Sequence, residues 1–310
     1  MPVDLSHTLV IGVSSRALFD MEEANRVYET EGVDAYARYQ MERVDEVMAP
    51  GTGFGLIKAL LELNRIATGP RKAEVVIMSR NSPATSLRMF HSIEHYGLDI
   101  LRAALAGGAG LAQYLHAFDV DLFLSAHDED VRTALNSGVA AARIYPTPAA
   151  IADPGEQIRI AFDADAVLFS NEAERIYQER GLTAFLEHEV ANARKPLPEG
   201  PFARLLRTLS GLQADAGFKK PPIRIAVVSA RNMPAHERVI RTLLAWDVRV
   251  DEAFFMGGVS KTKVLEAFAP HIFFDDQEAH CGPAAGSVPT ARVVEVCAIP
   301  AAPKKRGKRR

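Results

Sequence analysis

The 310-residue chain has a composition close to that of an ordinary soluble protein, with 48% hydrophobic and 24% charged residues. It contains no apolar run near the roughly 20 residues that a membrane-spanning helix needs, so no membrane partner is expected. Its first residues lack a basic segment followed by a long apolar stretch, so no export signal is expected. The only two cysteines, Cys281 and Cys297, favour a reducing cytoplasm over a disulfide framework.

Charge is unevenly distributed along the chain. The last seven residues, Lys304 to Arg310, contain six basic ones, and the whole chain has a net charge of −3, so the remainder carries −9. We expect residues 301–310 to form a disordered basic tail. This tail is either a solvated extension or a weak, non-specific contact for nucleic acid. The acidic remainder argues against nucleic acid as the main ligand.

Apolar strand patterns alternate with helical patterns in both halves of the chain. This alternation predicts an α/β fold with parallel sheets, and the short apolar runs fit strands buried on both faces. In chain order, the predicted strands are Thr8–Val13, Glu74–Met78, Leu122–Leu124, Ile158–Phe162, Ile223–Val228 and Ile272–Phe274. The predicted helices are Gly55–Leu63, Ala84–Tyr96, Pro201–Leu212 and Ala235–Trp246.

An internal repeat with an offset of 150 residues relates the two halves. Ser79 lies opposite Ser229, and the glycine pair at 107–108 lies opposite the pair at 257–258. We therefore predict two related Rossmann-like modules, about 1–150 and 151–300, joined by a proline-containing link at Pro146, Pro148 and Pro154.

Two aspartates, Asp163 and Asp165, follow directly after a predicted strand of the second half. Ligands of open parallel sheets bind beyond the carboxyl ends of the strands, so these carboxylates are placed for chemistry. Taken alone, the Asp-x-Asp pattern also fits an ordinary turn after a strand.

Further polar residues follow the other predicted strands of this half. Ser229 ends one strand, Asp275 and Asp276 end another, and Lys261 begins a helical pattern. Such residues could hold a phosphoryl group and Mg²⁺, which prefers oxygen ligands. Each also has an ordinary interpretation as a turn or surface residue, and Lys263 is an alternative to Lys261.

The joint order of these residues resembles the haloacid dehalogenase superfamily of phosphotransferases. The resemblance implies that Asp163 is the nucleophile and Asp165 the general acid and base. It implies that Ser229 and Lys261 hold the phosphoryl group. It also implies that Mg²⁺ is bound by Asp163, Asp165 (through its backbone carbonyl), Asp275 and Asp276.

Longer stretches resemble the cytosolic 5'-nucleotidases of type I. They are Ser14–Phe19, Arg159–Ser170, Phe185–Glu189, Lys195–Leu197 and Pro270–Gln277. This resemblance implies Mg²⁺-dependent hydrolysis of nucleoside 5'-monophosphates such as AMP or deoxynucleotides, in the cytoplasm.

The insert at about 171–220 resembles the small helical cap of the superfamily, which can close over a substrate. Phe185, His188 and Glu189 are candidate nucleoside contacts, and an aromatic ring such as Phe185 could stack on a base. Simple packing of Phe185 and an ordinary surface position of His188 are the alternatives. Arg231 could meet phosphate or pair with a carboxylate.

At the corresponding positions, the first half lacks the acid nucleophile, the acid–base residue, the lysine and the metal carboxylate. It has Ser14 and Arg16 near the positions of the two aspartates, Leu111 opposite the lysine and Ser125 opposite Asp275. We therefore predict a degenerate, non-catalytic module, either a scaffold or a wall of the substrate site. In the second case Arg16 and Asn81 would contact the nucleotide.

Two other functions stay open from the residues alone. One is a phosphatase for sugar phosphates or other small monoesters. The other is a non-catalytic nucleotide- or nucleic-acid-binding protein, although binding alone would not require a nucleophile. The sequence leaves both a monomer and a homo-oligomer possible.

Overall fold

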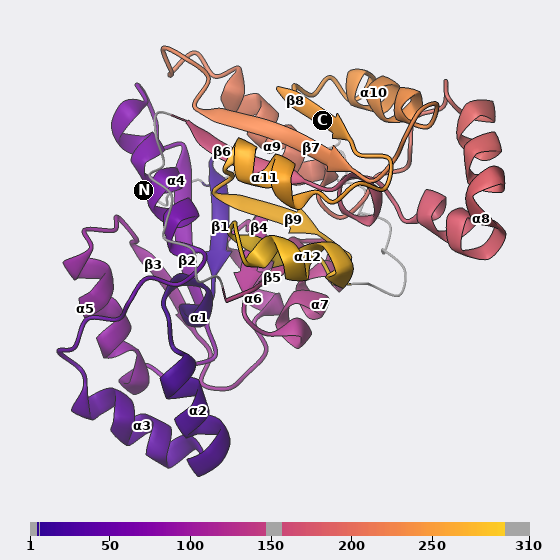
Figure 1. Ribbon diagram of the computed structural model, residues 1–310. Helices are drawn as coiled ribbons and strands as arrows, with labels where there is room; N and C mark the ends of the chain where they lie inside the picture. The colour runs from indigo at the N-terminus through magenta and orange to yellow at the C-terminus, as the bar shows by residue number, and fades with distance from the viewer. Residues whose placement is uncertain (1–4, 6, 147–156, 295–310) are drawn as a thin grey trace, which may run out of the picture.

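The computed structural model describes residues 5, 7–146 and 157–294 (Figure 1). The basic tail, Cys297 and the link prolines Pro148 and Pro154 lie outside these residues. Ten strands form one sheet in the order β3-β2-β1-β4-β5-β10-β9-β6-β7-β8. The strands are β1 (Leu9–Val13), β2 (Ala73–Ser79), β3 (Arg102–Leu105), β4 (Leu122–Ser125), β5 (Ala140–Ile144), β6 (Ile158–Phe162), β7 (Ile223–Ser229), β8 (Glu252–Phe255), β9 (Ile272–Asp275) and β10 (Thr290–Arg292).

Helices connect the strands in both halves. In the first half they are α1 (Ser15–Leu18), α2 (Glu22–Glu31), α3 (Val33–Glu42), α4 (Phe54–Ile66), the short η1 (Ala84–Ser86), α5 (Leu87–His95), α6 (Ala112–Ala117) and α7 (Asp128–Asn136). In the second half they are the irregular turn η2 (Ala164–Leu168), α8 (Glu172–Ala191), α9 (Ala203–Gln213), α10 (His236–Ala245), α11 (Thr262–Phe268) and α12 (Glu278–Ala285). None of the helices in the described part is both long and apolar enough to cross a bilayer.

The predicted α/β fold is confirmed as a ten-stranded, mostly parallel sheet. Every residue of β1, β2, β4 and β9 is buried, which requires cover on both faces of the sheet. The six predicted strands are all present within one or two residues of their expected ends. The sequence patterns missed β3, β5, β8 and β10, which are short and in part rich in alanine, a residue with low strand preference.

One antiparallel contact joins the two halves of the sheet. All neighbouring strands pair in parallel except β5 and β10, where Ile144 lies opposite Ala291. The strands of the second half therefore run opposite to those of the first. As a result, the carboxyl ends of β1 and β2 lie at one rim of the sheet, and the carboxyl ends of β6, β7 and β9 lie at the other.

In each half, one helical segment, here called an excursion, extends away from the sheet. Its extent differs from that of the predicted helical insert. In the second half the excursion is α8, which is interrupted by Gly181 at φ 77°, whereas α9 packs against β7 (Figure 1). The segment at about 171–220, in which the sequence predicts a cap, therefore includes a helix, α9, that lies against the sheet. The first half has its own excursion, α2 and α3, which are separated by Gly32 at φ 86°. A residue with a side chain would be strained at either glycine.

Candidate active site

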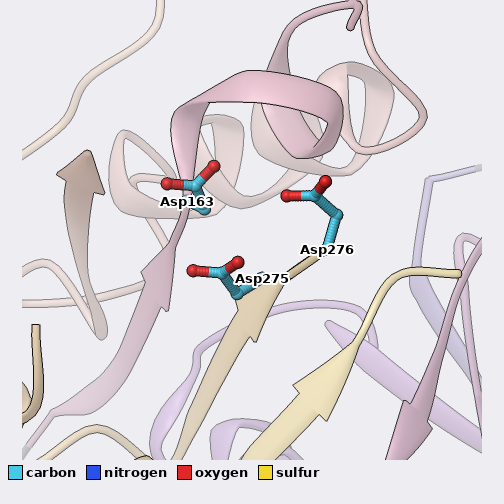
Figure 2. Close-up of side chains that lie close together, drawn as sticks. All are labelled: Asp163, Asp275 and Asp276. Carbon is cyan, nitrogen blue, oxygen red and sulfur yellow. The ribbon is translucent and has the colours of Figure 1, made fainter. Parts of the chain in front are cut away.

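A buried acidic cluster lies where β6 and β9 end (Figure 2). Asp163 follows β6, Asp275 is the last residue of β9, and Asp276 comes next in the chain. One carboxylate oxygen from each lies within 4.8 Å of the others. The side chains meet because β6 and β9 are parallel neighbours, so their carboxyl ends share one rim. A backbone hydrogen bond of 2.7 Å from Asp163 N to Phe274 O fixes the two strand ends together.

The ammonium group of Lys261 lies within this cluster. Lys261 precedes α11, is only 3% exposed, and donates to Asp163 Oδ1 at 2.5 Å and to Asp275 Oδ2 at 2.6 Å. Lys263, the alternative suggested by the sequence, is exposed. The lysine of the cluster is therefore Lys261.

His280 of α12 supports Asp275 from its other side. Its Nδ1 lies 3.2 Å from Asp275 Oδ2, and Gln277 N donates to Asp275 Oδ1 at 2.9 Å. Burial opposes ionisation, but the hydrogen bond with His280 and the charge of Lys261 outweigh it and lower the pKa of Asp275. The sequence interpretation missed His280, although its position five residues after Asp275 on a helix is a usable signal.

The other two carboxylates have raised pKa values. Burial, reinforced by Asp275 and Asp165 and opposed by Lys261, raises the pKa of Asp163 to about 7. Burial and the charges of Asp163 and Asp275 raise the pKa of Asp276 to about 8, and its Oδ1 is buried without a hydrogen-bond partner. Crowded carboxylates with an unpartnered oxygen fit a hard divalent cation such as Mg²⁺. The cluster could therefore hold a metal ion.

We expect Mg²⁺ to stabilise the folded protein through this cluster. Binding to the folded state alone adds about 2.7 kcal/mol at a concentration 100 times the Kd. Thermal melting with Mg²⁺ or with EDTA should thus show a higher Tm in Mg²⁺. The Asp276→Asn variant should lose most of this difference. The Asp128→Asn variant, which removes a carboxylate paired with Arg143 in the other half, should keep it. An equal Mg²⁺ effect in both variants would contradict binding at the cluster.

Asp165 and Arg231 form a bidentate ion pair beside the cluster. Arg231 Nε donates to Asp165 Oδ2 at 2.8 Å, and Arg231 Nη2 donates to Asp165 Oδ1 at 2.7 Å. The carboxylate of Asp165 is therefore directed to the arginine and is not one of the three carboxylates of the acidic cluster. Ser229 ends β7 and is fully buried, and its hydroxyl accepts from Arg231 N at 3.2 Å.

Arg231 and Arg238 share a second carboxylate, that of Glu189 on α8. Glu189 is 1% exposed and accepts from Arg231 Nη1 and, at 2.8 Å, from Arg238 Nη1. These ion pairs thus link α8 to the residues that follow β7. Arg231 pairs with carboxylates, one of its two predicted alternatives. Sequence reasoning did not single out Arg238, because its partner lies 49 residues away.

Phe185 and His188 lie on the same helix but differ in accessibility. Phe185 is buried, packs with Ala173 and Ala235, and lies with its ring 5.4 Å from the guanidinium carbon of Arg231. Its ring is thus occupied by packing in this structure. His188 is partly exposed, and its Nδ1 lies 3.2 Å from Glu189 Oε1.

Arg16 and Asn81 lie far from the acidic cluster. They follow β1 and β2, whose carboxyl ends form the opposite rim of the sheet from the one that holds Asp163. β1 and β6 are also five strand spacings of about 4.8 Å apart, or about 24 Å. This placement corrects the expectation that Arg16 and Asn81 form a wall of the nucleotide site around Asp163.

The fold and the cluster define an α/β protein with a possible metal site at the carboxyl ends of parallel strands. The chain belongs to the 5'-nucleotidase family, whose model matches residues 1–298. It is 35% identical over 289 residues to human cytosolic 5'-nucleotidase 1B, a match that covers 90% of this chain and 47% of the relative. The chain therefore spans about half the length of that curated relative. These matches confirm the family resemblance drawn from the sequence.

A solved structure, histidinol dehydrogenase from Elizabethkingia anophelis, also matches, with 12% sequence identity and a TM-score of 0.23. That match covers 91% of this chain and 52% of the other. A likeness this weak carries no argument about fold or function.

Proposed function

We propose that this chain is a Mg²⁺-dependent hydrolase of nucleoside 5'-monophosphates that acts in the cytoplasm through an aspartyl-phosphate on Asp163. The observation that supports it most directly is the contact of Asp163, Asp275 and Lys261 in one buried cluster. Family membership supports the nucleotide substrate. A buried nucleophile next to a lysine and possible metal ligands is suited to phosphoryl transfer, which depends on positioning and charge stabilisation.

The proposed reaction has two steps on the protein's own residues. A carboxylate oxygen of Asp163 attacks phosphorus, the bond between phosphorus and the ribose 5'-oxygen breaks, and Asp165 gives that oxygen a proton. Asp165 then takes a proton from water, which attacks the aspartyl-phosphate, and inorganic phosphate leaves with Asp163 regenerated. Bound Mg²⁺, held by Asp163, Asp275, Asp276 and the backbone carbonyl of Asp165, would supply charge neutralisation at phosphate.

In the proposed mechanism, Asp165 must exchange its ion pair with Arg231 for the leaving oxygen of the substrate. Ser229 and Lys261 hold the phosphoryl oxygens, and Arg231 is available for a substrate contact once Asp165 has turned. His188, partly exposed on α8, is the better candidate for a nucleoside contact, because Phe185 is buried.

We also propose that the two halves are related modules of the haloacid dehalogenase type and that only the second is catalytic. The same strand order, counted outward from the central β5–β10 pair, supports this. Backbone details also recur at offsets of 149 or 150 residues: the isolated bridge Phe19–Pro50 corresponds to Phe169–Glu199, and positive φ at Asp119 corresponds to positive φ at Ala269.

A phosphate-release panel tests the proposal. With Mg²⁺, we expect release from AMP, dAMP, IMP and CMP to exceed release from sugar phosphates, and EDTA should abolish it. Fastest turnover of a sugar phosphate would contradict the nucleotide assignment and favour a general monoester phosphatase. Nucleotide binding without any phosphate release would instead indicate a binding protein.

A further inference from the structure

The first half contains a cavity at the place that corresponds to the acidic cluster of the second half. It has a volume of about 560 Å³, and it is lined by residues that follow β1 and β2 and by the α2–α3 excursion. Ser14 and Leu111, which correspond to Asp163 and Lys261, are among the lining residues. Volumes of this size are typical of sites for small organic ligands.

The polar groups of the cavity include one donor without a partner and one that is weakly committed. Arg16 Nε is buried and makes no hydrogen bond, although Arg16 donates through its other nitrogens to Asn25 and Glu22. Asn81 Nδ2 is also buried, and the hydroxyl of Tyr36 is the acceptor that it faces. A buried donor without a partner costs free energy, so an acceptor supplied by a ligand would be favourable. Carbonyl oxygens, ring nitrogens and hydroxyls are suitable acceptors.

The charges of the cavity are already balanced by neighbours. Arg80 is paired with Asp130, and Arg16 is paired with Glu22 at 2.9 Å. The position of the catalytic lysine is taken by Leu111. A phosphate would therefore find no uncommitted cation among these groups and would meet the carboxylates at 128–130. The cavity suits an uncharged ligand.

Two tyrosines of the excursion add aromatic surface. Tyr28 and Tyr36 line the cavity with ring centroids 6.0 Å apart at an interplanar angle of 82°, and Tyr28 is 51% exposed. An exposed ring at the margin of a cavity can stack on a planar heterocycle. Met21 and Met78 provide apolar lining.

We infer that this cavity is a second, non-catalytic site that binds a nucleoside, that is, an uncharged planar base carrying a hydroxylated sugar. The choice of nucleoside rests on the proposed function, because a nucleoside is the product that the other half would release. The site is distinct from the acidic cluster, since it lies at the opposite rim of the sheet. Ligand binding here would let the non-catalytic half respond to product.

Calorimetric titration with adenosine tests this inference, with the full chain and matched variants of the two halves. Tyr28→Ala should weaken adenosine binding about tenfold or more, as expected for loss of a stacking ring. Asn81→Ala should weaken it as well. Tyr177→Ala is the control, because Tyr177 is the corresponding ring of α8, is 47% exposed and lies outside the cavity. It should leave this binding unchanged. Melting curves would establish that all three variants fold.

Three outcomes would overturn the inference: no adenosine binding to the parent chain, parental affinity in Tyr28→Ala, or tighter binding of AMP than of adenosine at the Tyr28-dependent site. The result is separable from the proposed function. Tyr28-dependent adenosine binding without phosphate release would support the second site and refute the proposed hydrolase activity. Phosphate release together with adenosine binding that does not depend on Tyr28 would support the hydrolase activity and refute the second site.

Discussion

Replacing Asp163 by asparagine is expected to reduce kcat for nucleotide hydrolysis by about 10⁴-fold or more. The amide cannot attack phosphorus, so the covalent route is lost and only binding and charge stabilisation remain. The fold should persist, because Lys261 keeps its 2.6 Å contact with Asp275. Phosphate release measured at saturating AMP with Mg²⁺ gives the size of the effect.

Two measurements distinguish a lost nucleophile from a damaged protein. Asp247→Asn, which changes an exposed aspartate in the same half, should keep parental turnover. Acid-quenched parent enzyme incubated with phosphate-labelled substrate should retain label on the protein, and the Asp163→Asn variant should not. A folded Asp163→Asn protein with parental kcat would refute the proposed mechanism.

Replacing Glu189 by glutamine is expected to lower the free energy of unfolding by several kcal/mol, about 3–5. Glu189 is almost fully buried and compensates two arginines whose side chains are only 2% and 5% exposed. Glutamine has nearly the same shape but no charge, so Arg238 loses its closest carboxylate and Arg231 retains only Asp165. Breaking a buried ion pair on one side typically costs about 3–5 kcal/mol.

Urea unfolding would measure this loss as a lower midpoint. The matched control is Glu187→Gln, two residues earlier on α8 and exposed, which should change the free energy of unfolding by less than about 0.5 kcal/mol. Equal midpoints for the two variants would show that the Glu189 network contributes no net stability.

The local patterns of the chain were sufficient to locate six of the ten strands, four helical segments and the acidic cluster. The three aspartates each follow an apolar run, and parallel strands must bring their carboxyl ends to one rim. The sequence also predicted a lysine at the start of α11, but it could not decide between Lys261 and Lys263. That choice depends on burial, which the structure shows and a single sequence does not.

Other features depend on contacts between residues distant in sequence. Asp165 is 66 residues from Arg231, and nothing near Asp165 indicates that its carboxylate would be held by an arginine. Phe185 has an aromatic ring suited to stacking on a base, but the ring packs against Ala173 and Ala235 instead. Such partners are set by the tertiary fold.

By itself, the sequence determined the α/β class, six of the ten strands, the family and the residues of the acidic cluster, because each follows from a local pattern or a conspicuous motif. Only the tertiary structure decided that the second half runs antiparallel to the first. The deciding contact is between β5 and β10, two short strands whose alanine- and arginine-containing segments give little local signal. Strand direction is a long-range property, and it is what separates Arg16 and Asn81 from Asp163 and leaves them around a cavity of their own.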